Sequence, residues 1–152
     1  MLPVRSPLLV ALAVGLLATG VIRTQAAPAS HEPINMEAVQ LAPQRQNGVE
    51  YLTGGIGEDE LRVLAQTRGY NLHVVSSTGA QDKYLADVNI TINKAGGESV
   101  LSLIQVGPLV YVKLPMGRYQ VIGSHDGRES RQNVVIDGKG IQTVYVHWND
   151  AY

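Results

Sequence analysis

The feature that most constrains this chain is a regular alternation of apolar and polar residues after Tyr70, interrupted by short glycine-containing turns. Residues 87–93 show it most clearly, because Val88, Ile90 and Ile92 alternate with polar residues. A period of two is typical of a strand that buries one face. Because the turns are too short to contain crossover helices, we expect the strands to pair largely antiparallel.

Seven segments of the chain fit this strand pattern. They are residues 70–77, 87–93, 99–106, 109–114, 118–124, 129–136 and 141–148. Tight turns separate them, and we identify Asp126-Gly127 as the strongest short hairpin signal in the sequence. The pattern predicts a mainly β protein in which two antiparallel sheets pack as a sandwich.

One helix is expected before the strands, within residues 51–69, which also contain a glycine-rich loop. Gly57 suits the N-cap, and Gly69 suits the left-handed residue that follows a helix end. Leu61 and Leu64 form a narrow apolar stripe, which we expect to pack on a face of the sandwich. Ile56 is placed to contact Leu61 as a hydrophobic staple.

The glycines before this helix invite comparison with a phosphate-binding loop. Such a loop continues into Lys and Ser or Thr, whereas Glu58, Asp59 and Glu60 follow here. These carboxylates complement the helix dipole and would repel a phosphate group. We therefore interpret the glycines as a helix start and predict no cofactor site.

The N-terminal residues follow the order of a secretory signal. Arg5 supplies the positive start, residues 7–22 are apolar, and residues 24–29 form a small-residue exit. We predict a cleaved signal at residues 1–29, a flexible tether at residues 30–50, and a periplasmic or secreted mature chain without a membrane span. An uncleaved anchor is the alternative, although the apolar run falls short of the roughly 20 residues of a spanning helix.

The composition excludes several classes of site and partner. The chain contains no cysteine, so it has no disulfide, thiolate zinc site or thiol nucleophile. Its 12 basic and 13 acidic residues give a net charge of -1. A nearly neutral protein has no strong field to attract nucleic acid, so no nucleic-acid partner is expected.

Three stretches carry a resemblance to a known family. They are residues 86–92 (ADVNITI), 114–121 (LPMGRYQV) and 134–136 (VVI). Together with the closing strand, they make residues 70–148 resemble the carboxypeptidase regulatory-like domain, in an exported bacterial protein with an N-terminal helical extension. The resemblance implies a seven-stranded antiparallel transthyretin-like (prealbumin-like) β-sandwich, with residues 149–152 as a tail. It also implies a non-catalytic accessory role.

The most specific part of this resemblance is the Leu-Pro-x-Gly-x-Tyr element at residues 114–119. Tyr119 and Val121 share one face of the expected strand, whereas Arg118 and Gln120 share the other. We therefore expect Tyr119 to be buried, with its ring over the proline turn and its hydroxyl bonded to a backbone group or placed at the solvent edge.

Residues that could support catalysis or bind metal do not form a recognised pattern. The four histidines, His31, His73, His125 and His147, have neither i,i+4 nor His-x-His spacing. No serine lies in a Gly-x-Ser-x-Gly turn. The chain also lacks the Tyr-Arg-Gly-Ser ending of the transthyretin-like ureide hydrolase. We expect no enzyme activity, no catalytic residue and no metal site.

The candidate ligand-binding residues are aromatic: Tyr111, Tyr145 and Trp148, with Tyr84 as a further candidate. Tyr111 and Tyr145 each lie between valines, so we expect both to point away from the core. Packing beneath the helix is the alternative for these rings, because the helix must cover one sheet face.

The sequence leaves two classes of function open. The first is a non-catalytic periplasmic or secreted accessory or interaction module, whose unknown partner is an envelope protein. The second is a carbohydrate- or small-ligand-binding domain that uses the surface tyrosines and Trp148. Clustering of Tyr111, Tyr145 and Trp148 on one exposed surface would favour the second class, and burial beneath the helix would favour the first.

Overall fold

The structure is a computed structural model that describes residue 39 and residues 41–149. The predicted signal peptide at residues 1–29, the first part of the predicted tether and residues 150–152 lie outside the described residues. No helix within the described part of the chain is long and apolar enough to cross a membrane.

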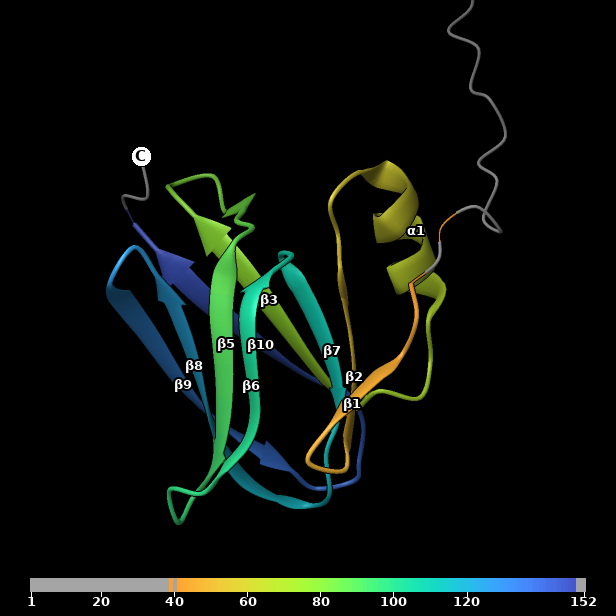
Figure 1. The fold of residues 1–152 in the computed structure, drawn as a ribbon, viewed down its shortest axis with the longest axis vertical. Coiled ribbons are helices and arrows are strands. Elements are labelled where there is room, and N and C mark those ends of the chain that lie inside the picture. Colours follow the sequence, from red (N-terminus) through yellow and green to blue (C-terminus); the bar gives the residue numbers. More distant parts are fainter. Residues whose placement is uncertain (1–38, 40, 150–152) are drawn as a thin grey trace, which may run out of the picture. The chain divides into compact units, whose positions relative to one another are not determined.

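The described residues form two sheets and one helix, α1 (Glu58–Gln66) (Figure 1). Sheet A contains, side by side, β1 (Gln44–Gln46), β2 (Val49–Gly54), β7 (Leu109–Lys113), β3 (Leu72–Thr78) and β10 (Gln142–Trp148), and β4 (Lys83–Tyr84) pairs with β3. Sheet B contains, in order, β6 (Ser99–Val106), β5 (Val88–Lys94), β8 (Gly117–His125) and β9 (Arg128–Ile136). The protein is therefore mainly β, as the alternation predicts.

All seven segments expected to be strands form strands, but ten strands are present in the described residues rather than seven. The additional strands are β1, β2 and β4. The first two form a hairpin around Asn47-Gly48, where both residues have positive φ, 51° and 78°. The side-chain amide of Gln46 also exchanges hydrogen bonds of 3.0 and 2.6 Å with the backbone of Ser102 in β6. Residues 44–50 are thus part of the sandwich, and their prediction as tether is corrected. Residues 51–54, predicted within the glycine-rich loop and helix segment, are also corrected, because they complete β2.

The strand pairing is largely antiparallel, with one exception. β10 pairs parallel to β3, with Val75 opposite Tyr145 and Ser77 opposite His147. The turn after β9 carries the chain from sheet B to sheet A instead of closing a hairpin, and β10 then lies beside β3. A tight turn therefore does not always join neighbouring strands in this fold.

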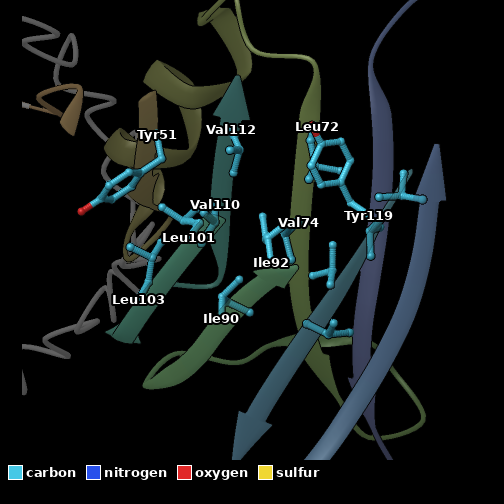
Figure 2. Packing of buried hydrophobic residues seen from close by; sticks show 14 of the residues in the cluster. Tyr51, Leu72, Val74, Ile90, Ile92, Leu101, Leu103, Val110, Val112 and Tyr119 are labelled. Atoms are coloured by element: carbon cyan, nitrogen blue, oxygen red, sulfur yellow. The ribbon is translucent and has the colours of Figure 1, made fainter. Parts of the chain in front are cut away.

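The main hydrophobic core lies between the two sheets (Figure 2). Sheet A contributes Tyr51, Leu72, Val74, Val110 and Val112, and sheet B contributes Ile90, Ile92, Leu101, Leu103 and Tyr119. The expectation for Tyr119 is confirmed, because its ring is buried and its hydroxyl donates a 2.8 Å hydrogen bond to the Pro115 carbonyl. A Cβ atom at Gly117 would lie 3.4 Å from the Tyr119 ring, so the ring packs directly against the turn.

A second apolar cluster lies on the face of sheet A that points away from sheet B. Leu64 of α1 is buried there against Leu52, Leu109 and Tyr111, and Leu61 is partly buried beside it. Figure 1 shows α1 on this side of β2. The predicted packing of the helix on a sheet face is confirmed.

The ends of α1 differ from the expectation. Ile56 is exposed and does not form a buried staple. The helix ends at Gln66, and Thr67 is already extended with φ -68° and ψ 138°. Gly69 has a positive φ of 94°, but it lies in the following loop rather than directly after the helix end. The sequence therefore predicts the presence of the helix better than the structure of its ends.

Candidate ligand-binding site

The helix α1 packs on one half of the outer face of sheet A, which we call the covered half. The other half is exposed to solvent, and we call it the open half. The strand register places Tyr111 of β7 beside His73 of β3, at the level where α1 packs. Farther along β3, Val75 lies beside Tyr145, and Ser77 lies between His147 on one side and Tyr84 on the other. The pairing of β3 with β10 and β4 thus brings together residues from distant parts of the sequence.

The covered half contains a stack of rings. Tyr111 lies face to face with His73, with ring centroids 3.6 Å apart and planes 3° apart, and it lies 6.2 Å from Tyr70. Burial lowers the pKa of His73 below its usual value of 6.5. Burial also raises the pKa of Tyr111 above 10.0; nearby Tyr84 adds to this shift and Arg68 opposes it. Tyr70 and Tyr111 belong to the buried cluster that contains Leu64 of α1, and Tyr111 is only 8% exposed.

The open half contains a hollow of about 510 Å³ that we call the tyrosine pocket. It is lined by Val75, Ser77, Asp82, Tyr84, Tyr145 and His147. Tyr84 is 53% exposed and Tyr145 is 61% exposed, so both rings have faces open to a ligand. A concave site that combines aromatic rings with a few polar groups is typical of small-ligand binding.

The polar side of the tyrosine pocket is organised by His147. Its Nδ1 atom lies 3.0 Å from the Ser77 hydroxyl oxygen and 3.2 Å from Asp82 Oδ1. Because these contacts use Nδ1, the imidazole is held in place while its Nε2 atom has no partner within the described part of the chain. Asp82 lies in a turn with φ 49° and is largely exposed. The pocket therefore presents a carboxylate and an imidazole nitrogen beside two tyrosine rings.

The three residues Ser77, His147 and Asp82 do not have the geometry of a catalytic triad. In a triad the serine and the carboxylate bind opposite nitrogens of the histidine, so that the ring can transfer a proton. Here both partners contact the same nitrogen, and Ser77 is buried. Among the described residues, no group of three or more His, Cys, Asp or Glu side chains could hold a metal ion.

The structure does not bring the predicted ligand-binding residues together. Tyr145 is exposed as expected, and Tyr111 points out of the sheet but is covered by α1. Trp148 lies in the main core, is only 4% exposed, and donates a 3.2 Å hydrogen bond from Nε1 to the Arg128 carbonyl. Of the three, only Tyr145 belongs to the tyrosine pocket.

Sequence reasoning missed Asp82, Ser77 and His147 as pocket residues. The alternation after Gln142 places Tyr145 and His147 on one face of β10, which was a usable signal. Their neighbours on β3 depend on the parallel pairing, for which the sequence has no local signal.

The structure also places His125 and the glycine-rich loop before α1. His125 contacts its neighbour Asp126, with Nε2 and Oδ2 3.3 Å apart, in the turn between β8 and β9. In the glycine-rich loop, the Glu60 carboxylate accepts 2.9 Å hydrogen bonds from the backbone N–H groups of Gly55 and Ile56. These N–H groups are already satisfied by the chain itself, as expected of a helix start rather than a phosphate site.

Comparison with known proteins returns no relative: no protein-family model, no curated protein and no solved structure matches this chain.

Proposed function

We propose that this chain is a non-catalytic binding module of the periplasm or the secreted fraction, and that its tyrosine pocket holds a sugar ring. The observation that supports this proposal is that Tyr84 and Tyr145, both more than half exposed, line one hollow together with Asp82 and His147. Exposed rings that gather in one hollow mark a site for a ligand or a partner, whereas scattered exposed rings do not.

The chemistry of the pocket suits a carbohydrate. The faces of tyrosine rings are electron-rich and attract the polarised C–H groups on the flat side of a sugar. Tyrosine also loses little conformational entropy on binding, because it has only two side-chain torsions. The Asp82 carboxylate accepts hydrogen bonds from sugar hydroxyls, and His147 Nε2, which has no partner among the described residues, gives a further polar contact.

We further propose that residues 70–148 form a carboxypeptidase regulatory-like domain with a transthyretin-like arrangement of strands. Two findings support this proposal. Each of the seven expected segments is a strand, and the Leu-Pro-x-Gly-x-Tyr element closes its turn through the hydrogen bond from Tyr119 to Pro115. In this interpretation β1 and β2 are additions before the domain, and β4 is an addition within it.

A second candidate is an accessory or interaction module that binds an envelope protein. The burial of Tyr111 beneath α1 and of Trp148 in the core favours this candidate, because it leaves fewer rings for a sugar. The two candidates differ in whether isolated oligosaccharides bind.

The test is a calorimetric titration of the exported protein with soluble oligosaccharides of glucose and of N-acetylglucosamine. We expect saturable binding to one of them, weakened at least tenfold by Tyr145→Ala, which corresponds to about 1.4 kcal/mol. Ile104→Ala is the matched control, because Ile104 is an exposed apolar residue of β6 in the other sheet. Absence of binding to both sugars, or equal affinity in the Tyr145 variant, would contradict the proposal and favour the protein partner.

A further inference from the structure

The outer face of sheet B contains a second hollow, which the tyrosine pocket does not explain. It has a volume of about 480 Å³ and lies over β5, β8 and β9. Three amide side chains cross it in register: Asn93 lies opposite Gln120, and Gln120 lies opposite Asn133. We call this hollow the amide pocket.

The amide side chains are held by one another and by a neighbouring arginine. Gln120 Nε2 donates a 3.3 Å hydrogen bond to Asn133 Oδ1, and Gln120 Oε1 accepts one of 3.3 Å from Arg131. Asn93 Oδ1 is buried and has no hydrogen-bond donor. A buried acceptor without a partner is unusual in a folded protein, and an ordered water or a bound ligand would satisfy it.

The amide pocket also carries positive charge. Lys94 and Arg118 line it, and no acidic residue does. The Lys94 ammonium is bonded to Glu98 at 3.0 Å. The Arg118 guanidinium makes no hydrogen bond or ion pair with any residue of the described part of the chain. Arg118 is therefore the cation in this pocket that is available to a ligand.

We infer that the amide pocket is a second binding site and that it takes an acidic sugar, with the carboxylate of a uronic acid on Arg118 and its hydroxyls on the amides. The planar guanidinium matches a carboxylate with two parallel hydrogen bonds. Amide groups both donate and accept, so they pair with hydroxyls, which do the same. The site contrasts with the tyrosine pocket, because binding here relies on charge and hydrogen bonds without an exposed aromatic ring.

This inference does not depend on the proposed function, since the two pockets lie on different sheets. Its test is an NMR titration of the exported protein with glucuronate, with glucose and inorganic phosphate as separate arms. We expect saturable shifts of the side-chain amide signals of Gln120 and Asn133 with glucuronate. Arg118→Gln should weaken this binding at least tenfold, and added salt should weaken it in the unsubstituted protein.

Arg45→Gln is the matched control, because Arg45 is an exposed arginine of β1 that pairs with Glu50 in sheet A. Its affinity for glucuronate should equal that of the unsubstituted protein. Absence of shifts with glucuronate, equal affinity in Arg118→Gln, or equal affinity for glucose would overturn the inference. Equal affinity for phosphate would overturn the assignment to a sugar. The variant Tyr145→Ala should bind glucuronate with unchanged affinity. This result would distinguish binding at the amide pocket from binding at the tyrosine pocket.

Discussion

The two outer faces of the sandwich differ in character, although both arise from the same alternation of residues along strands. On sheet A, Tyr111 stacks on His73 and packs in the cluster that contains Leu64 of the helix, whereas Tyr84 and Tyr145 are exposed. The outer face of sheet B carries mostly amide, hydroxyl and charged side chains, together with the exposed apolar residues Ile104 and Val135, and no aromatic ring within the described residues. The outer face of sheet A is therefore rich in aromatic rings and partly covered by the helix, whereas the outer face of sheet B is largely polar and exposed to solvent.

The helix explains this difference. A sheet face that meets solvent is polar, whereas a face that meets another element is apolar. Because α1 covers only part of sheet A, the apolar character of this face continues past the helix as exposed rings. The tyrosine pocket lies beyond the part of this face that the helix covers. Its rings are therefore aromatic, like those beneath the helix, but they remain exposed.

Substitution on β8 tests whether the inward and outward faces of sheet B differ as the comparison requires. Tyr119→Ala should lower the free energy of unfolding by about 3 to 5 kcal/mol, because it leaves a large cavity in the core. Gln120→Ala should change it by less than about 0.5 kcal/mol, because Gln120 lies on the outward face. The measurement is urea unfolding of both variants, and equal denaturation midpoints would contradict the assigned faces.

Substitution in the helix tests whether the outer face of sheet A is a true second core. Leu64 is fully buried between α1 and the sheet, so Leu64→Ala should cost about 2 to 5 kcal/mol. Arg62→Ala is the control, because Arg62 is an exposed helix residue whose pair with Glu58 at 3.7 Å contributes little. A loss below about 1 kcal/mol for Leu64→Ala would show that the helix is only peripheral to stability.

The strands of the sandwich were predictable because their signal is local. In β5 the apolar residues Val88, Ile90 and Ile92 are all buried, as their period of two requires. The β1–β2 hairpin had an equally local signal in Asn47-Gly48, which is a preferred pair for a two-residue turn. The sequence analysis does not predict this hairpin, because β1 is short and polar and therefore lacks the alternation of a half-buried strand.

The candidate site was predictable only in part, because it depends on contacts between distant segments. Alternation alone places Tyr145 on the outward face, and the structure shows it exposed. The same argument also placed Tyr111 outward, but the position of α1 decides that its ring is buried. The association of Tyr84 and Asp82 with His147 depends on the parallel β3–β10 pair, in which the facing residues Ser77 and His147 are 70 positions apart in the sequence.

The smallest expected effect concerns the one titratable imidazole in the covered half of sheet A. His73 stacks on Tyr111, and burial lowers its pKa below the usual 6.5. In the unfolded chain, His73 takes up a proton as the pH falls through about 6.5, whereas the folded protein resists this uptake. The contribution of neutral His73 to stability is therefore fully present above pH 6.5 and is lost as the pH falls below that value.

The variant His73→Phe keeps an aromatic ring for Tyr111 but cannot bind a proton, so it isolates this contribution. Urea unfolding at pH 8 and pH 5.5 should show a larger loss of stability for the unsubstituted protein than for His73→Phe. Other titrating groups contribute equally to both proteins, so they cancel in the difference between the two losses. The same loss in both proteins would mean that His73 is solvated in the folded state. In that case the cover over this half of sheet A would be looser than the contact between its rings indicates.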